Sequence, residues 1–329
     1  MIPTTRAARR ATIHLLGVLG LAWVASVARA QDYPSHPVRL IVPFAAGGPA
    51  DVYARFIATR LQESLGQTFI VDNRPGAGSV IGTDAVAKSA PDGYTLLLMS
   101  NTHTVNESLI PNKPFQLMRD FAPIAPINAS DLVLVTRADL PVGSLADLLK
   151  LAKSKPGGLS YASSGPGTPY HMAGELFKAM AGVSILHIPY KGSSGARTDV
   201  IGGQVDMMFD AVPTMSEFVR TGKVKALATT GLTRSAVMPE LPTMAEAGVP
   251  KYEATIWLGL MAPKATPPAI LKRLNAEVGR IVGNPDVAKA WKAQGAIAMV
   301  MGQGEFWRYL DDDIAKWARI VKISGAKAE

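Results

Sequence analysis

The sequence predicts an α/β protein of two domains built around largely parallel sheet, and three observations carry this prediction. From residue 38 onward, short apolar runs alternate with segments of helical periodicity, the order expected of strands layered with helices. Loops rich in glycine and other small residues separate many of these runs. The 329 residues are 48% hydrophobic and 18% charged, which suits a globular chain long enough for two domains.

The first half of the chain shows three strand patterns in succession. The strand "VRLIVPF" leads through "AAGGPA" to a predicted helix over 51–65, which Gly66 ends. "TFIVDNR" (68–74) is the next strand, and "YTLLLMS" (94–100) is the third. The third strand enters a polar stretch at 100–106.

The second half of the chain carries clear helix starts. Ser144 precedes a helical pattern, and Thr168 followed by Pro169 places a capping residue before a proline at the first helical position. Strands "LHIPY", "DMMFD" and "KALATT" alternate with these helices. Further predicted starts are a capping-box spacing of Thr243 and Glu246, and the pairs Thr266-Pro267 and Asn284-Pro285.

Two longer strand-like segments interrupt this alternation. "FAPIAPINASDLVLVTR" (121–137) is apolar but contains prolines, and "YEATIWLGLMAPK" (252–264) resembles it. We interpret both as passages between the two domains.

Residues 1–30 have the layout of a secretory signal peptide. A basic stretch with Arg6, Arg9 and Arg10 precedes the apolar run "ATIHLLGVLGLAWVA", which is short for a membrane span. Small residues at Ala28 and Ala30 follow. We therefore expect bacterial export, cleavage after Ala30, and a soluble mature protein in the periplasm.

Charge and cysteine content exclude several classes of function. Residues 1–30 hold four arginines and no acidic residue, so the formal net charge falls from +8 to +4 after cleavage. This mild charge, without a long run of Lys or Arg, argues against nucleic acid as a partner. The chain has no cysteine, which excludes disulfides, thiolate metal sites and thiol nucleophiles.

The motifs of enzyme chemistry are missing. "GSSGA" is not the Gly-x-Ser-x-Gly elbow of a serine hydrolase, because Ala196 stands at its last position. "GAGSVIG" (76–82) has one residue too many between its last glycines for a dinucleotide fingerprint, and there is no P-loop. The histidines show no metal-ligand spacing, and we interpret the acidic run 311–313 as a solvated helix face. We expect no catalytic residue, no metal and no cofactor.

Four loops instead indicate a binding site. "VPFAAGGPAD" runs from a strand into a helix through small residues, and "YASSGPGTPYHMAGELF" (161–177) repeats this arrangement in the second half. "SNTHT" (100–104) and "PYKGSSGA" (189–196) follow two further strands. Ligands of α/β sheets sit beyond the carboxyl ends of the strands, and helix N-termini that face each other there would suit an anion.

The residues also resemble a known family. Five ordered blocks resemble the Bug-type extracytoplasmic solute receptors, the periplasmic substrate-binding proteins of tripartite tricarboxylate transporters. The resemblance covers essentially the whole mature chain, although Asn106-Glu107 stands where relatives tend to carry Asn-Pro. The blocks are "IVPFAAGGPADVYAR", "VDNRPGAGSVIG", "SSGPGTPYHMAGELF", "HIPYKGSSGARTDVIGGQVDMMFD" and "LPTMAEAGVPKYE…WLGLMAPKATP".

The resemblance implies a type II periplasmic-binding-protein fold, with two α/β lobes joined by two crossing strands. Lobe 1 would comprise residues 31–129 and 254–329, and lobe 2 residues 130–253. A carboxylate-bearing ligand would be gripped between the lobes by backbone amides, hydroxyls and ordered waters.

Ligand contacts carry over from the matching blocks. Asp51 is expected to serve the helix dipole rather than the ligand, because a carboxylate there would repel an anion. Asp210 has two open readings: it faces the cleft and welcomes an amino or hydroxyl group, or it makes a structural hydrogen bond. The expected contacts are Phe44, Ala46, Gly47, Gly48, Ser100, Asn101, Thr102, Ser163, Ser164, Gly165, Thr168, Tyr190, Lys191 and Asp210.

We therefore predict a monomeric, non-enzymatic receptor that captures a small carboxylate and delivers it to membrane transporter subunits. The alternative is a secreted serine hydrolase using Ser163 or Ser193, neither of which has a base or elbow in the sequence. Aliphatic dicarboxylates, citrate-like tricarboxylates, acidic amino acids and aromatic acids all fit the pattern. Transport and signalling both remain open as the main output.

Overall fold

Ten strands form one mixed sheet within residues 33–328, the part of the chain that the computed structural model describes. Their order is β2-β1-β3-β9-β4-β7-β5-β6, and β8 and β10 each pair with β4. The predicted signal peptide and its cleavage site lie outside the described residues. The strands are β1 (Val38–Val42), β2 (Phe69–Asn73), β3 (Thr95–Ser100), β4 (Phe121–Arg137), β5 (Ser160–Ser163), β6 (Leu186–Pro189), β7 (Met207–Ala211), β8 (Val224–Thr229), β9 (Thr255–Pro263) and β10 (Ala296–Ala298).

Helices follow most strands, as the alternation in the sequence predicts. Among the described helices, none combines the length and apolar character that a bilayer crossing requires. They are α2 (Pro49–Leu65), the 3-10 helix Ala77–Ser79, α3 (Val80–Ala87), α4 (Asn101–Leu109), α5 (Leu117–Asp120), α6 (Leu145–Ser154), α7 (Pro169–Ala181), α8 (Ser193–Ile201), α9 (Val212–Arg220), α10 (Pro268–Val282), α11 (Pro285–Lys292) and α12 (Gln303–Ser324).

The first lobe is built on the parallel strands β2, β1 and β3. Val38 pairs with Phe69 on one side of β1, and Leu40 pairs with Leu96 on the other. The apolar run of β1 is buried except for Arg39, as expected of a strand covered on both faces. Trp257 and Phe306 complete the core of this lobe.

The second lobe is built on β7, β5 and β6, which are also parallel. Tyr161 pairs with His187 of β6 and with Met207 of β7. The core of this lobe includes Phe177, Phe209 and Tyr252, all fully buried. Each lobe therefore has its own hydrophobic core.

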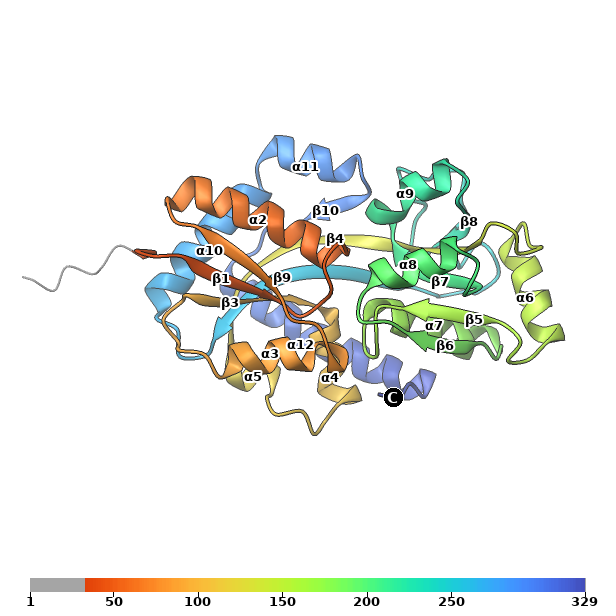
Figure 1. Ribbon diagram of the computed structural model, residues 1–329, viewed down its shortest axis with the longest axis horizontal. Helices are drawn as coiled ribbons and strands as arrows, with labels where there is room; N and C mark the ends of the chain where they lie inside the picture. The colour runs from red at the N-terminus through yellow and green to blue at the C-terminus, as the bar shows by residue number, and fades with distance from the viewer. Residues whose placement is uncertain (1–32, 329) are drawn as a thin grey trace, which may run out of the picture. The chain divides into compact units, whose positions relative to one another are not determined.

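The strands β4 and β9 pass from one lobe to the other, side by side in Figure 1. They pair antiparallel from Phe121↔Pro263 to Asp131↔Thr255. Beyond that point β4 continues into the second lobe, where Leu132 pairs with Ala211 of β7. The prediction of two α/β lobes joined by two crossing strands is confirmed.

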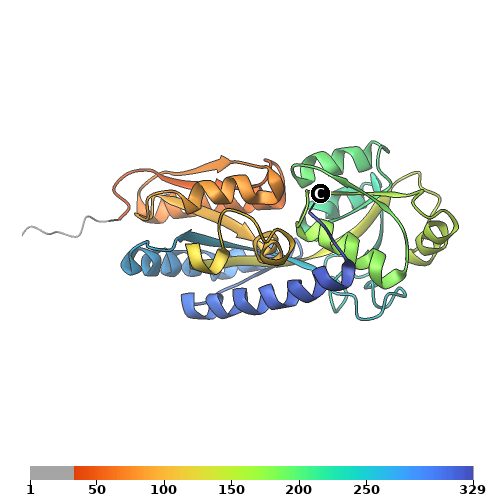
Figure 2. The same ribbon diagram turned by 90° about the horizontal axis from the view of Figure 1, so that it is seen from below.

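The C-terminal helix α12 packs against both lobes and runs beneath them in Figure 2. Its Trp317 joins Val105 of α4 and Met172 of α7 in one buried cluster. Asp313 is also buried, accepting hydrogen bonds from Thr104 Oγ1 (2.6 Å) and Trp257 Nε1 (3.1 Å). The interpretation of 311–313 as a solvated face is therefore wrong for Asp313, because this residue anchors the helix.

The predicted helix starts are partly correct. Ser144, Thr168 and Asn284 are N-caps whose side chains accept backbone N–H groups. Thr266 is not a cap, because α10 begins at Pro268 with Pro267 before it. Thr243 and Glu246 do exchange capping-box hydrogen bonds, but residues 243–248 form a turn without a helix.

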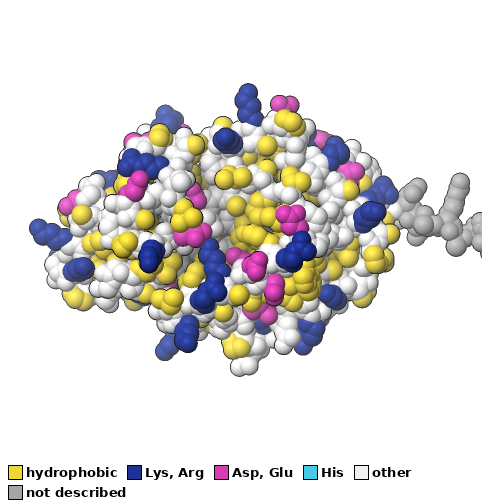
Figure 3. All heavy atoms as spheres, turned by 180° about the vertical axis from the view of Figure 1, so that it is seen from behind, with side chains coloured by type: hydrophobic (Ala, Val, Ile, Leu, Met, Phe, Trp, Pro, Cys, Tyr) yellow, Lys and Arg dark blue, Asp and Glu magenta, His cyan; other side chains and the backbone are white. Residues whose placement is uncertain are grey.

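Three of the scattered histidines are buried, and we call His103, His171 and His187 the buried histidines. Burial lowers the pKa of His103 and His171 to about 4 and that of His187 to about 3. They are therefore neutral at pH 7. On the surface, basic and acidic side chains are interspersed over the face in Figure 3, in keeping with the mild net charge.

Candidate functional site

A small cavity of about 20 Å³ lies where helices from both lobes begin. Gly48 and Ser100, the N-caps of α2 and α4, line it from the first lobe. Tyr170 in the first turn of α7 and Gly192 at the N-cap of α8 line it from the second. Because helix N-termini present N–H groups and positive dipole ends, this arrangement favours an anion.

The helices α2 and α8 begin at glycines and have no side-chain cap. Their first-turn N–H groups are therefore not occupied by a capping oxygen of the protein. Pro49, at the first position of α2, has no N–H to offer. The first turns of α2 and α8 are thus suited to receive oxygen atoms of a ligand.

The loop before α2 contacts the first turn of α8 and the residue Lys191 before this helix, across the lobes. Ser194 Oγ donates to the carbonyl of Ala46 (3.1 Å), and the Ala45 N–H donates to the carbonyl of Lys191 (3.4 Å). We call residues 45–48 and 191–194 the inter-lobe latch. The structure therefore describes the lobes in contact at this side of the cavity.

The helices α4 and α7 carry side-chain caps that also offer hydroxyls near the cavity. Ser100 Oγ accepts the N–H of Thr102 (3.2 Å). Thr168 Oγ1 accepts the N–H of His171 (3.4 Å) and donates to the carbonyl of Gly165 (2.7 Å). These caps fix the first turns of both helices.

Apolar side chains form the remaining wall of the cavity. Phe44 lies at the end of β1, and Ile256 and Leu258 come from the crossing strand β9. Burial keeps the pKa of Tyr170 well above its ordinary value, so its hydroxyl is neutral. Of the described residues that line the cavity, none carries a charge, so an anion would be held by N–H groups and hydroxyls.

A wider groove of about 560 Å³ shares two lining residues, Phe44 and Ser164, with the cavity. Gly165, Tyr190 and Lys191 line it from the second lobe. The Tyr190 hydroxyl donates to Asp199, and burial together with this carboxylate raises the pKa of Tyr190 to about 12. Lys191 is the basic side chain that the second lobe contributes to the lining of the groove.

Most of the residues expected to bind a ligand lie in these two spaces. The cavity and the groove together are lined by Phe44, Gly48, Ser100, Thr102, Ser164, Gly165, Thr168, Tyr190 and Lys191.

The other expected residues lie beside these spaces and contact the protein. Gly47 donates its N–H to Asp51 (3.0 Å), which confirms the expected role of Asp51 at the start of α2. Ala46 belongs to the inter-lobe latch, and Asn101 Nδ2 donates to the carbonyl of Thr255 on β9 (2.8 Å). Asn101 thus ties α4 to a crossing strand.

Asp210 makes structural hydrogen bonds, which was one of the two roles that the sequence allowed for it. It is fully buried and accepts two hydrogen bonds from Arg197, at 2.8 and 3.0 Å. Its second oxygen accepts the Ala211 N–H (2.8 Å). The carboxylate is thereby neutralised within the second lobe.

Ser163 has a partner that the sequence does not indicate. His187 Nε2 lies 2.7 Å from Ser163 Oγ, so a base stands beside this serine although no motif connects them. Ser163 is fully buried and His187 nearly so, which keeps a substrate away from the pair. Ser193, the other candidate nucleophile, lies in the first turn of α8 against Gly48.

Sequence reasoning missed several lining residues. Some follow directly from the loops that it singled out, since the first turn of each helix comes next in the chain. Ile256 and Leu258 had no local signal, because only the sheet order brings β9 to the cavity. The missed residues are Ala45, Pro49, Ala50, Pro169, Tyr170, Gly192, Ser193, Ile256 and Leu258.

Asn106 and Glu107, which stand where relatives tend to carry Asn-Pro, both make hydrogen bonds within the first lobe. Asn106 Nδ2 donates to the carbonyl of Gly78 (2.8 Å), which holds the turn beside the groove. Glu107 pairs with Lys113 (2.9 Å) and accepts the N–H of Leu117 (3.0 Å). Both residues therefore organise the rim of the first lobe.

The fold and the cavity together define a binding protein of the two-lobed periplasmic type. Residues 53–326 match the family described as tripartite tricarboxylate transporter family receptor, and the chain belongs to this family. It is 41% identical over 320 residues to Protein BugT of Bordetella pertussis, which covers 95% of this chain and 98% of BugT. The resemblance to Bug-type receptors is confirmed.

Solved structures agree with this assignment. The structure of R. palustris Rpa4515 with adipate is 35% identical, has a TM-score of 0.87, and covers 90% of this chain and 99% of that one. MatC from Rhodopseudomonas palustris with bound malate is 31% identical, has a TM-score of 0.83, and covers 88% of this chain and 100% of that one. The predicted periplasmic-binding-protein fold is thus confirmed.

Proposed function

We propose that this chain is an exported periplasmic receptor that captures a small organic carboxylate between its lobes. It delivers the ligand unchanged to the membrane subunits of a tripartite tricarboxylate-type transporter. It acts as a monomer and without a cofactor. The fourteen residues predicted from the sequence are the proposed surroundings of the ligand, with Ser163, Asn101 and Asp210 supporting the contacts rather than making them.

One observation carries this proposal: the N-termini of α2, α4, α7 and α8 meet at a cavity that no charged described residue lines. Such a site attracts a carboxylate through N–H groups and dipoles, and its apolar wall accepts the carbon skeleton. The structures of relatives with adipate and with malate support a small carboxylate as the ligand.

The proposed mechanism is closure of the two lobes around the ligand. Lobe 1 consists of residues 31–129 and 254–329, and lobe 2 of residues 130–253. The hinge lies where β4 and β9 cross between the lobes, near the pair Ser130↔Ile256. Closure brings α2 and α8 together through the inter-lobe latch, so the carboxylate meets N–H groups of both lobes.

A thermal-shift panel tests the proposal. Adipate, malate, citrate, glutamate and benzoate are compared with glucose and arginine. A ligand at a hundred times its dissociation constant adds about 2.7 kcal/mol to the free energy of unfolding. For a chain of this size the melting temperature should rise by about 5–10 °C. Small-angle scattering should show contraction at the same concentrations; shifts by glucose or arginine alone would reject the anion site.

A hydrolase is the second candidate, favoured only by the distance of 2.7 Å between Ser163 Oγ and His187 Nε2. Burial of both groups weighs against it. Incubation of the protein with the carboxylates and with their methyl esters distinguishes the two functions. A receptor returns each compound unchanged, whereas a hydrolase releases methanol from an ester.

A further inference from the structure

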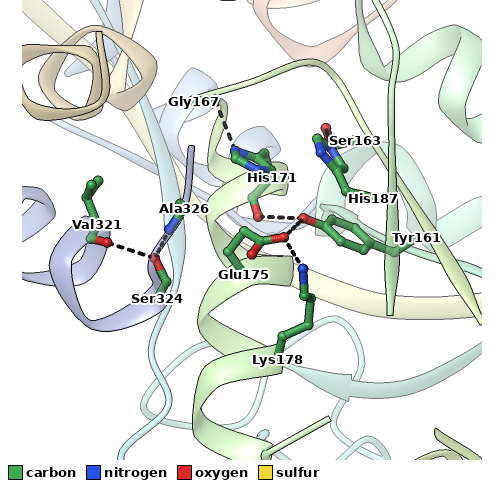
Figure 4. A network of polar contacts seen from close by, with 10 residues as sticks. All are labelled: Tyr161, Ser163, Gly167, His171, Glu175, Lys178, His187, Val321, Ser324 and Ala326. Carbon is green, nitrogen blue, oxygen red and sulfur yellow. Dashed lines mark hydrogen bonds and ion pairs between the residues drawn. The ribbon is translucent and has the colours of Figure 1, made fainter. Parts of the chain in front are cut away.

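A stack of three aromatic rings lies under the loop that leads from β5 into α7 (Figure 4). The rings of His171 and His187 are 4.3 Å apart and nearly parallel. Tyr161 stacks on the other face of His187 at 4.8 Å. The histidines come from α7 and β6, so the stack joins two elements at the edge of the second lobe.

Both histidines are hydrogen-bonded to residues 163–168, which we call the entry loop. His171 Nδ1 accepts the N–H of Gly167 (3.1 Å). His187 Nε2 bonds to Ser163 Oγ (2.7 Å), and this oxygen accepts the N–H of Gly165 (3.1 Å). Each glycine of the entry loop is thus tied to one histidine, directly or through Ser163.

The entry loop depends on such anchors because its backbone is unusual. Gly165 and Gly167 have φ values of 118° and 72°, in the region that favours glycine. The loop also passes close to other backbone, since a Cβ on Gly165 would lie 2.9 Å from the carbonyl oxygen of Tyr190. Its conformation is therefore set by its few hydrogen bonds.

The charge around the stack is balanced. Glu175 accepts hydrogen bonds from the Tyr161 hydroxyl (2.6 Å) and from Lys178 (2.7 Å), so both charges near the histidines are paired. The rings are neutral at pH 7 because burial lowers their pKa values. A neutral His171 can accept the Gly167 N–H through Nδ1, which a protonated ring cannot.

We propose that His171 and His187 are positioning residues for the ligand, because they hold the entry loop so that Ser164 and Thr168 face the cavity and the groove. This inference rests on the proposed capture of a carboxylate between the lobes. Neither histidine lines the cavity or the groove, so each acts through the loop. The loop in turn caps α7, whose N-terminus lies at the cavity.

The test compares asparagine and glutamine at both positions, since the two side chains have the same polar group at different reach. In His171→Asn the oxygen takes the place of Nδ1 and can still accept the Gly167 N–H. In His187→Gln the amide reaches the place of Nε2 beside Ser163. His171→Gln and His187→Asn put the same groups one bond too far or too near.

Adipate, malate, citrate, glutamate and benzoate are titrated into each protein by calorimetry. His171→Asn and His187→Gln should keep the affinity of the original protein within about threefold. His171→Gln and His187→Asn should bind the carboxylate about tenfold more weakly, or worse. Tyr161→Phe serves as the control: it loses the hydroxyl bonds to Glu175 and to the His171 carbonyl but keeps the ring and both imidazoles, so it should lower stability and leave affinity unchanged.

A second measurement needs no ligand. Amide hydrogen exchange at Gly165 and Gly167 should be faster in His171→Gln and His187→Asn than in His171→Asn and His187→Gln. Equal exchange and equal affinity in all four variants would overturn the positioning role. If the original protein binds none of the five carboxylates, the proposed function fails, and the exchange rates still decide the role of the histidines.

Discussion

Replacement of Gly192 by alanine should hinder lobe closure without unfolding either lobe. Gly192 has an extended backbone (φ 174°), which alanine adopts without strain. A Cβ at this position would lie 2.7 Å from Cβ of Ala45 and 3.2 Å from its backbone nitrogen. Ala45 belongs to the first lobe and Gly192 to the second, so the added methyl group clashes only while the lobes are in contact.

The magnitude follows from the size of this overlap. Carbon atoms pack at about 3.5–4.0 Å, so the inter-lobe latch must open by roughly 1 Å to admit the methyl group. Overpacking of this kind costs about 1–3 kcal/mol. Because the cost falls on the closed form alone, affinity for a carboxylate should drop by about 5- to 150-fold. The ligand-free protein should keep its melting temperature.

Calorimetry with adipate and malate, together with scattering, measures this effect. Gly143→Ala is the matched control in the second lobe, since its Cβ would lie 3.7 Å from Asp147 Oδ2, an ordinary contact. The control should bind as the original protein does. If Gly192→Ala binds with unchanged affinity and contracts fully, the latch is not part of the bound form and the reasoning fails.

Three further predictions follow from the caps, the leader and the buried histidines. Thr168→Ala should cost about 1 kcal/mol of stability as a lost cap and weaken carboxylate binding roughly ten- to a hundredfold, whereas Ser144→Ala should lower only the melting temperature. N-terminal sequencing of periplasmic material should show cleavage after Ala30; an intact leader in membranes would contradict this. The buried histidines have pKa values of about 4 or 3 in the folded protein, so the unfolded chain binds more protons once the pH falls below its ordinary histidine pKa. The free energy of unfolding should therefore fall by about 3 kcal/mol per histidine between roughly pH 6.5 and pH 4. Asp313, whose pKa burial raises to about 6, offsets part of this loss, because it takes up a proton more readily in the folded state. A melting temperature that stays constant over this range would contradict the burial of the histidines.

Local signals in the sequence predicted the helix starts well where the backbone continued as a helix. Thr168 with Pro169 and Asn284 with Pro285 each combine a capping oxygen with a proline that has no N–H to satisfy. Thr243 makes the same kind of cap, but Gly248 follows with φ 112°, and the segment turns away. A capping signal therefore predicts a first turn and leaves the rest of the helix to the following residues.

Contacts between distant residues could not be predicted in this way. Thr104 and Asp313 are 209 positions apart, and Ser163 and His187 are 24 apart, yet both pairs are buried hydrogen bonds. Nothing in the spacing of these residues distinguishes them from solvated ones. The loops that surround the cavity were predictable because glycines and caps act on their own neighbours, whereas Ile256 and Leu258 reach it only through the order of the sheet.

The pairing of charged side chains near the cavity fits the proposed function, in which a receptor must release its ligand. Arg197 lies one turn beyond Ser193 on α8, but its guanidinium is paired with the buried carboxylate of Asp210. The second lobe thus keeps a full positive charge away from the cavity and leaves the helix N-termini as the source of positive potential there. A buried arginine would bind a carboxylate strongly and would lose much of its solvation on closure. In the proposed function, partial charges on N–H groups require less desolvation and hold the anion in the closed cavity, and opening of the proposed hinge returns both partners to water. The pair Arg197–Asp210 therefore removes two full charges from the surroundings of the cavity and leaves the proposed contacts with the carboxylate to backbone N–H groups.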